Sequence, residues 1–116
     1  MCAGTNIRQR DVVLISFPFS DLSATKKRPA LVISNDSFNS RSEDTICCLI
    51  TSNPESTPNA VFISNGDMES GNLEFDSKVK PYKIFTADKN LIVKVLGRLN
   101  SGKFASVVKE INKIIG

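Results

Sequence analysis

Apolar runs alternate with turn-forming residues along most of the chain, which indicates a series of short strands. Apolar, β-branched runs occupy residues 11–17, 30–33, 45–51 and 60–64, and such runs bounded by Gly, Pro, Asn, Asp or Ser are typical of strands. Two further runs lie at 78–86 and 94–99. Pro81 predicts an edge strand or a bulge in the first of these, because proline cannot donate to a strand ladder.

The polar segments between these runs predict turns and loops. Residues 18–27 (PFSDLSATKK) are polar and turn-forming, which predicts an exposed loop after the first strand. The cluster SNDS at 34–37 predicts a turn, and turn signals at 65–67 and 71–72 lie on either side of Met68. We therefore expect no helix or strand in these segments.

After residue 100 the apolar period changes from two to that of a helix. Six apolar residues lie on one helical stripe: Phe104, Val107, Val108, Ile111, Ile114 and Ile115. Asn100 or Ser101 is suited to the N-cap, and Gly116 follows where a C-cap would lie. Short strands followed by one amphipathic helix predict a mainly β fold: a small, strongly bent antiparallel barrel or sandwich with the helix packed on it.

Composition indicates one globular domain. Of 116 residues, 41% are hydrophobic and 23% are charged, as in an ordinary folded domain. The apolar runs are far shorter than the roughly 20 residues that a membrane helix needs. The first ten residues lack an apolar segment, so we expect no secretory signal, no membrane association and a cytoplasmic location.

The chain contains no histidine, which excludes several kinds of site. Ser-His-Asp and Cys-His nucleophiles, His-ligated zinc and a histidine pair for RNA cleavage are all ruled out. The three cysteines are Cys2, Cys47 and Cys48, an odd number that argues against a disulfide framework. Cys47 and Cys48 lie in an apolar run and are interpreted as small hydrophobic residues. We expect neither a metal nor another cofactor.

Charge is divided unevenly along the chain. Residues 77–116 carry nine Lys or Arg against two acidic residues, a net charge of +7, whereas residues 1–76 carry six against ten, a net charge of −4. This asymmetry favours a basic face for a polyanion. The alternative is a solvated helix surface with no partner.

Four segments in the same order resemble one known family. The stretch 11–35, DVVLISFPFSDLSATKKRPALVISN, is similar to the first two strands of the MazF/PemK family of toxin ribonucleases. CLITS at 48–52, SKVKPYKIFTADK at 77–89, and GRL at 97–99 followed by a helix resemble its later segments. The resemblance covers roughly residues 8–115.

This resemblance implies an SH3-like barrel that pairs into a homodimer. It also implies metal-independent cleavage of single-stranded RNA at short motifs, leaving a 2′,3′-cyclic phosphate and a 5′-hydroxyl, and inhibition by a cognate antitoxin with an acidic segment. We expect one toxin domain over residues 1–116, with residues 1–9 loosely ordered.

The resemblance assigns catalysis to Arg28 and Thr51. A guanidinium can stabilise the charge that develops on the phosphate, and a threonine hydroxyl can donate to a phosphate oxygen or orient the 2′-hydroxyl. The alternatives are an exposed arginine in a KKR run and a threonine bonded to its own loop. No general base is assigned.

Further residues are expected to bind RNA. Ser52 follows Thr51, as is common in the family, and Lys26, Lys27, Lys80 and Lys83 are expected to hold phosphates. Phe19 and Tyr82 offer rings for base stacking, whereas Phe17 is expected in the core. Tyr82 replaces an acidic residue of some members, and Arg10 replaces a family glycine. A non-cleaving nucleic-acid- or protein-binding module, or a gyrase-directed toxin on the same scaffold, is the alternative function.

Overall fold

The computed structural model describes residues 6–18, 25–54 and 57–116, and its strands form one antiparallel sheet. The seven strands have the order β4-β6-β3-β2-β1-β7-β5. They are β1 (Asp11–Pro18), β2 (Thr25–Val32), β3 (Asp44–Thr51), β4 (Val61–Ile63), β5 (Met68–Gly71), β6 (Ser77–Asp88) and β7 (Ile92–Leu99). The helices are α1 (Asp36–Arg41), α2 (Ser101–Ile115) and the 3-10 turns η1 (Asn65–Asp67) and η2 (Lys89–Leu91).

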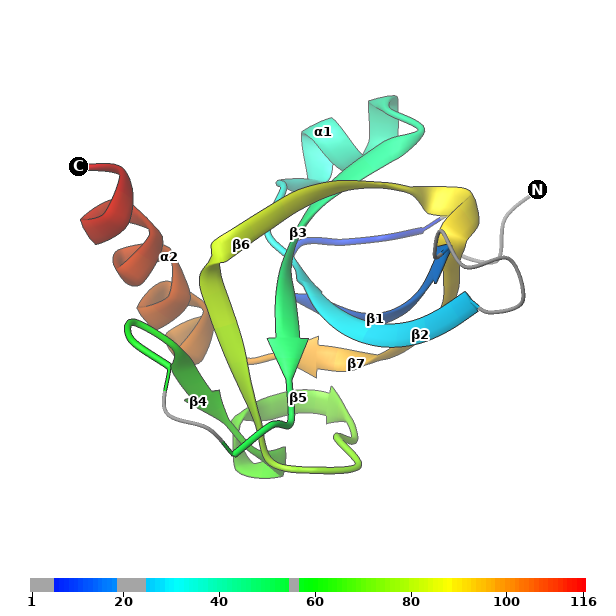
Figure 1. Ribbon diagram of the computed structural model, residues 1–116. Coiled ribbons are helices and arrows are strands. Elements are labelled where there is room, and N and C mark those ends of the chain that lie inside the picture. Colours follow the sequence, from blue (N-terminus) through cyan, green and yellow to red (C-terminus); the bar gives the residue numbers. More distant parts are fainter. Residues whose placement is uncertain (1–5, 19–24, 55–56) are drawn as a thin grey trace.

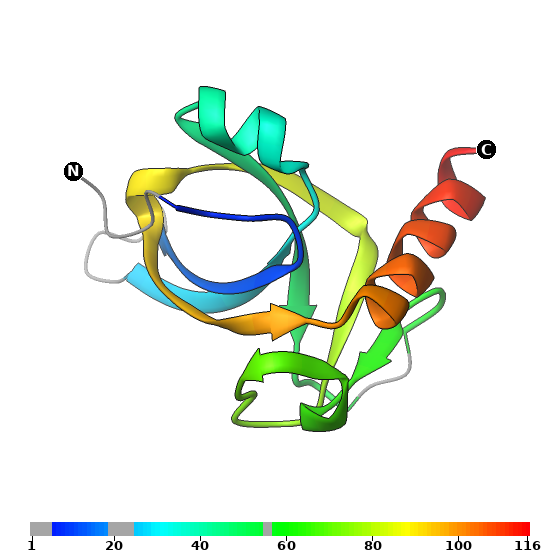
Figure 2. The same cartoon turned by 180° about the vertical axis from the view of Figure 1, so that it is seen from behind.

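The sheet curls into a barrel. In Figure 1, β1, β2, β3, β6 and β7 curve around a common interior, and α1 lies outside this ring, above the arch of β6. Helix α2 lies outside this ring, beside β4 and β6, as the reverse view in Figure 2 also shows. The predicted fold, a mainly β antiparallel barrel with a C-terminal helix, is confirmed. No helix in the described part of the chain is long and apolar enough to cross a membrane.

Two hydrophobic clusters, one on each face of the central strands, hold the barrel together. Val12 and Leu31 belong to the cluster that α2 covers, whereas their neighbours Val13 and Val32 belong to the second cluster. Successive strand residues point to opposite faces. Because both faces of β1 and β2 are buried, these strands are continuous apolar runs rather than alternating ones.

Helix α2 is capped as predicted but is only partly covered. The Asn100 side chain accepts a hydrogen bond from the Lys103 N–H at 2.7 Å. Val107 is fully buried, and Phe104 and Ile111 pack against the first cluster. Ile115, by contrast, is 74% exposed. The first half of the apolar stripe therefore packs on the barrel of its own chain, and its end does not.

The polar segment after β2 forms a short helix where a turn was predicted. Helix α1 is capped by Asn35, whose side chain accepts the Phe38 N–H at 2.8 Å. Asn39 is buried, donating from Nδ2 to the Ser34 carbonyl at 2.9 Å and accepting the Thr45 hydroxyl at 3.0 Å. This network is non-local, so the sequence pattern gave no sign of it.

Strand β5 was also missed, because turn residues flank it. Its last residue, Gly71, pairs with Gly97 of β7. A Cβ on Gly97 would lie 2.3 Å from the Ser70 carbonyl oxygen, so the two strands approach this closely only because Gly97 has no side chain. The glycine of the GRL segment thus allows a polar edge strand to pair.

Strand β2 is longer than predicted, and strand β6 contains an insertion. Strand β2 begins at Thr25, so the predicted loop over 18–27 is wrong for residues 25–27, which pair with the end of β1. In β6, Leu49 of β3 pairs with Lys80 and the adjacent Cys48 pairs with Ile84. Residues 81–83 are therefore inserted without partners on β3, and the bulge predicted at Pro81 is confirmed.

Residues 6–9, part of the N-terminal segment that we expected to be loosely ordered, contact the barrel. Ile7 is buried in the second cluster. The Gln9 N–H donates to Asp36 Oδ1 at 2.8 Å, and Gln9 Nε2 donates to the Ile33 carbonyl at 2.9 Å.

Candidate functional site

The candidate catalytic residues lie at the ends of two neighbouring strands. Strands β2 and β3 pair at Ala30↔Leu49, Leu31↔Cys48 and Val32↔Cys47. Both strands continue past this ladder, β2 back to Thr25 and β3 on to Thr51. The same register places Arg28 across from Thr51 and Lys27 across from Ser52, beyond the last paired residues.

The row that contains Arg28 and Thr51 continues across the sheet. Thr51 pairs with Lys78 of β6, and Lys78 pairs with Phe62 of β4. Side chains directly opposite one another in antiparallel strands share a face. The register therefore gives one face a guanidinium, a hydroxyl, an ammonium and an aromatic ring, which together suit a phosphate and a base.

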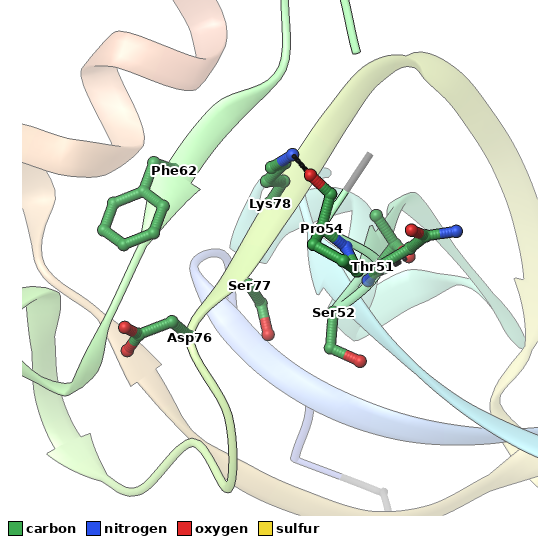
Figure 3. A pocket seen from close by; sticks show the side chains of 8 residues that line it. Thr51, Ser52, Pro54, Phe62, Asp76, Ser77 and Lys78 are labelled. Carbon is green, nitrogen blue, oxygen red and sulfur yellow. Dashed lines mark hydrogen bonds between the residues drawn. The ribbon is translucent and has the colours of Figure 1, made fainter. Parts of the chain in front are cut away.

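A first cavity of about 190 Å³ lies at the end of β3 (Figure 3). It is lined by Thr51, Ser52, Asn53, Pro54, Phe62, Asp76, Ser77 and Lys78. Lys78 Nζ donates to the Pro54 carbonyl at 3.3 Å, which ties β6 to the turn after β3. The phenyl ring of Phe62 is 55% exposed. The cavity therefore combines hydroxyl groups, an ammonium group and an open apolar surface.

The Thr51 hydroxyl is hydrogen-bonded to its own loop, as the structural alternative to a catalytic role predicts. Its Oγ1 accepts the Asn53 N–H at 3.1 Å. A hydroxyl accepts through its lone pairs and donates through its hydrogen, so this bond fixes the oxygen without using the hydrogen. The structural and the catalytic interpretation of Thr51 are thus compatible.

A second cavity of about 490 Å³ adjoins the first. It is lined by Leu14, Lys27, Pro29, Ser52, Asn72, Leu73, Glu74, Phe75, Ser77, Lys94 and Leu96. Ser52 and Ser77 line both cavities. The two hollows therefore meet at these serines.

The structure brings some of the predicted residues together and leaves others apart. Thr51 and Ser52 line the first cavity, and Lys27 and Ser52 line the second. The other predicted residues within the described ranges line neither of these two: Arg28, Lys26, Lys80, Tyr82 and Lys83. Phe19 lies outside the described residues.

The positions of these five residues differ. Arg28 is half-buried opposite Ile15, and Lys26 is exposed opposite Phe17 on the same face of β2. Lys80 lies two residues from Lys78 and so shares its face. Tyr82 and Lys83 are exposed in the bulge of β6, so the register does not place them in the row of Arg28 and Thr51.

The structure confirms that Phe17 lies in the core and that Cys47 and Cys48 are buried hydrophobic residues. Phe17 packs beside the second cluster, with its ring centroid 5.4 Å from that of Phe85. Cys47 and Cys48 are fully buried, and burial raises the pKa of each thiol to about 12. Such thiols stay protonated and are not nucleophiles. Within the described residues, no three His, Cys, Asp or Glu side chains are grouped so that they could hold a metal ion.

Sequence reasoning missed Lys78, Phe62 and Asp76 as site residues. Lys78 alternates with Lys80 in SKVK, which is the pattern of a strand with one basic face. That alternation was the only signal for it. Phe62 and Asp76 enter the site through pairing of β4 with β6 and through the turn before β6, both of which are tertiary features.

Residues 8–115 match the family of PemK-like, MazF-like toxins of type II toxin–antitoxin systems, and the chain belongs to that family. No curated protein matches the sequence significantly.

Several solved structures share the fold. MazF in a MazE–MazF structure from Deinococcus radiodurans has a TM-score of 0.79 at 18% identity, covering 96% of this chain and 97% of that one. An endoribonuclease from a mycobacterial species has a TM-score of 0.73 at 19% identity, covering 96% and 92%. Mycobacterium tuberculosis toxin MazF-mt6 has a TM-score of 0.73 at 15% identity, covering 91% and 96%.

Proposed function

We propose that this toxin is an endoribonuclease that cleaves single-stranded RNA at short motifs. The proposal rests on the pairing of β2 with β3, whose register, continued two residues past the last pair Ala30↔Leu49, would set Arg28 across from Thr51. Membership of the toxin family supports it, as does the shared fold with proteins described as endoribonucleases.

The reaction we propose is attack of a 2′-hydroxyl on the adjacent phosphorus. The 2′-oxygen bonds to phosphorus as the bond to the 5′-oxygen breaks. The 2′-hydroxyl loses its proton and the 5′-oxygen gains one, giving a 2′,3′-cyclic phosphate and a 5′-hydroxyl. The guanidinium of Arg28 stabilises the negative charge on the nonbridging oxygens, and Thr51 donates to the phosphate or orients the 2′-hydroxyl. No step requires a metal or another cofactor.

Basic residues around this row suit the flanking phosphates. Lys26 lies two residues from Arg28 on β2, and Lys78 and Lys80 lie on the same face of β6. Point charges of this kind hold the backbone of single-stranded RNA without reading its sequence. Lys83, in the bulge, extends the basic surface along β6, and the exposed Tyr82 beside it offers a ring for base stacking.

The partners we propose are a second copy of this chain and a cognate antitoxin. Solved structures with this fold include an endoribonuclease in complex with its cognate antitoxin. An acidic antitoxin segment complements a face that bears Arg28, Lys78 and Lys80. We place the protein in the cytoplasm, where its RNA substrate is.

Cleavage of a long RNA in the presence of EDTA tests this function. Arg28→Ala and Thr51→Val are compared with the control Arg41→Ala. Arg41 is an exposed arginine at the end of α1, which follows the other end of β2, so the control removes the same charge away from the site. We expect Arg28→Ala to lower the cleavage rate about 10²- to 10³-fold, as loss of one preorganised donor does elsewhere. Arg28→Lys restores little, because an ammonium cannot donate in a bidentate manner.

Three results would contradict the proposal. They are cleavage that disappears with EDTA, equal rates for wild type and the double variant of Arg28 and Thr51, and equal losses for Arg28→Ala and Arg41→Ala. Tight RNA binding without cleavage would favour the non-cleaving module, and binding to gyrase in place of RNA would favour the gyrase-directed toxin.

A further inference from the structure

The second cavity has the features of a site for one unpaired base. Its volume of about 490 Å³ lies in the range of small-molecule pockets. Leu14 pairs with both Lys94 and Pro29, so these three residues form one row across β7, β1 and β2. Leu73, which is buried, adds to the apolar lining. A flat base needs such a surface against its faces.

An exposed aromatic ring and two positive charges complete this lining. Phe75 is 62% exposed, although it is a large apolar side chain. An open ring beside a cavity is available for stacking, which every base accepts. Lys27 and Lys94 are also exposed and line the same cavity. Their charges complement the phosphate that a nucleotide carries.

The cavity is continuous with the proposed catalytic row. Ser52 and Ser77 line both cavities, and Ser52 directly follows Thr51. Continued past its last pair, Ala30↔Leu49, the β2–β3 register would set Arg28 across from Thr51 and Lys27 across from Ser52. Successive strand residues point to opposite faces. Lys27 therefore points to the opposite face of β2 from Arg28, and the second cavity meets the catalytic side only around the end of β3, where Ser52 and Ser77 line both cavities.

We propose that the second cavity binds one unpaired base next to the scissile phosphate and so sets one position of the cleavage motif. This inference rests on the proposed function, because it takes single-stranded RNA as the ligand. Phe75 stacks on the base, Lys27 and Lys94 hold its phosphate, and Glu74 reads its edge.

The chemistry of Glu74 gives the preference of this position. An ionised carboxylate only accepts hydrogen bonds. Guanine, adenine and cytosine each present an amino group to it, whereas uracil presents one N–H between two carbonyl oxygens, which a carboxylate repels. Glu74 therefore selects against uracil. Glutamine, which both donates and accepts, removes that selection.

The test sequences the ends of RNA cleaved by wild type, Glu74→Gln and Phe75→Ala. Glu43→Gln is the matched control, because Glu43 is an exposed carboxylate in the turn between α1 and β3. We expect wild type to disfavour uracil about tenfold at one motif position, a discrimination typical of a single edge contact. Glu74→Gln should abolish that preference with the other positions unchanged, and Phe75→Ala should weaken binding about tenfold. Glu43→Gln should match wild type.

A second measurement separates this inference from the proposed function. A randomised single-stranded RNA pool with methylated 2′-hydroxyls, which is resistant to cleavage, is selected for binding to the same four proteins. If wild type cleaves and all variants keep its motif, the base site is refuted and the ribonuclease stands. If wild type does not cleave but selects against uracil through Glu74, the ribonuclease is refuted and the base site stands. If binding is equal for all four proteins, the base site is refuted in either case.

Discussion

Arg10 has a backbone conformation that its side chain makes costly. Its φ of 79° lies in the left-handed region, which favours glycine. The chain resembles a family in which a glycine usually precedes the first-strand acid, and Arg10 occupies that position. The backbone conformation gives the physical reason for that glycine. We therefore ask how the protein tolerates an arginine there.

The Arg10 side chain makes contacts that a glycine cannot. Its Nη1 donates to the Leu99 carbonyl at 2.8 Å and to Glu69 Oε1 at 3.0 Å. A hydrogen bond from a charged group contributes about 1.5–3 kcal/mol when it is partly buried. The exposed pairing with Glu69 adds little. We expect Arg10→Ala, which loses these bonds and keeps the backbone conformation, to lower the free energy of unfolding by about 2 kcal/mol.

Arg10→Gly loses the same bonds but removes the strain. A residue other than glycine in the left-handed conformation costs about 1–2 kcal/mol. Glycine avoids this cost but lowers the free energy of unfolding by about 0.4–1 kcal/mol, because it gives the unfolded chain more conformational entropy. The difference leaves Arg10→Gly more stable than Arg10→Ala by about 1 kcal/mol. Wild type should remain the most stable of the three.

Urea denaturation of the three proteins measures these differences. Arg8→Ala and Arg8→Gly form the control pair, because Arg8 is exposed and its φ is not in the left-handed region. Glycine should be the less stable residue at position 8 and the more stable one at position 10. If alanine is at least as stable as glycine at position 10, the strain argument is refuted.

Two more predictions concern buried groups. Burial raises the pKa of Asp11, and among the described residues its Oδ1 has no hydrogen-bond partner. The folded state therefore binds a proton at Asp11 more tightly than the unfolded state does. The free energy of unfolding falls as the pH rises above about 4, because Asp11 then has to ionise while it is buried. The stability advantage of Asp11→Asn should grow from pH 4 to pH 7, and an advantage that shrinks would contradict this. Cys47 and Cys48, each with a pKa of about 12, should resist iodoacetamide at pH 8 until the chain is unfolded; peptide mass spectrometry that finds them alkylated in the native protein would refute their burial.

The local sequence alone was enough to predict β1, α2 and the bulge in β6. The continuous apolar run at 11–17 predicted β1, and the helical stripe with Asn100 before it predicted α2 and its cap. Pro81 predicted a bulge because the missing N–H is a property of the residue itself. The motifs around Arg28 and Thr51 indicated the family, which the match over residues 8–115 confirmed.

Long-range pairing decided what those patterns could not. Strand β5 is polar, and it exists because Gly97, on a distant strand, lets it approach. Helix α1 depends on Asn39, whose partners Ser34 and Thr45 belong to segments on either side of it.

The candidate site shows the same division. The sequence alone singled out Arg28 and Thr51 as residue types in a motif, but it contained no distance between them. Their positions at the ends of two neighbouring strands come from the pairing of β2 with β3, and Lys78 and Phe62 join Thr51 through two further strand pairings. Periodicity reports which face of a strand is buried, whereas register depends on which strand lies beside it. The tertiary structure therefore decided which of the predicted residues lie together and which cavity adjoins them.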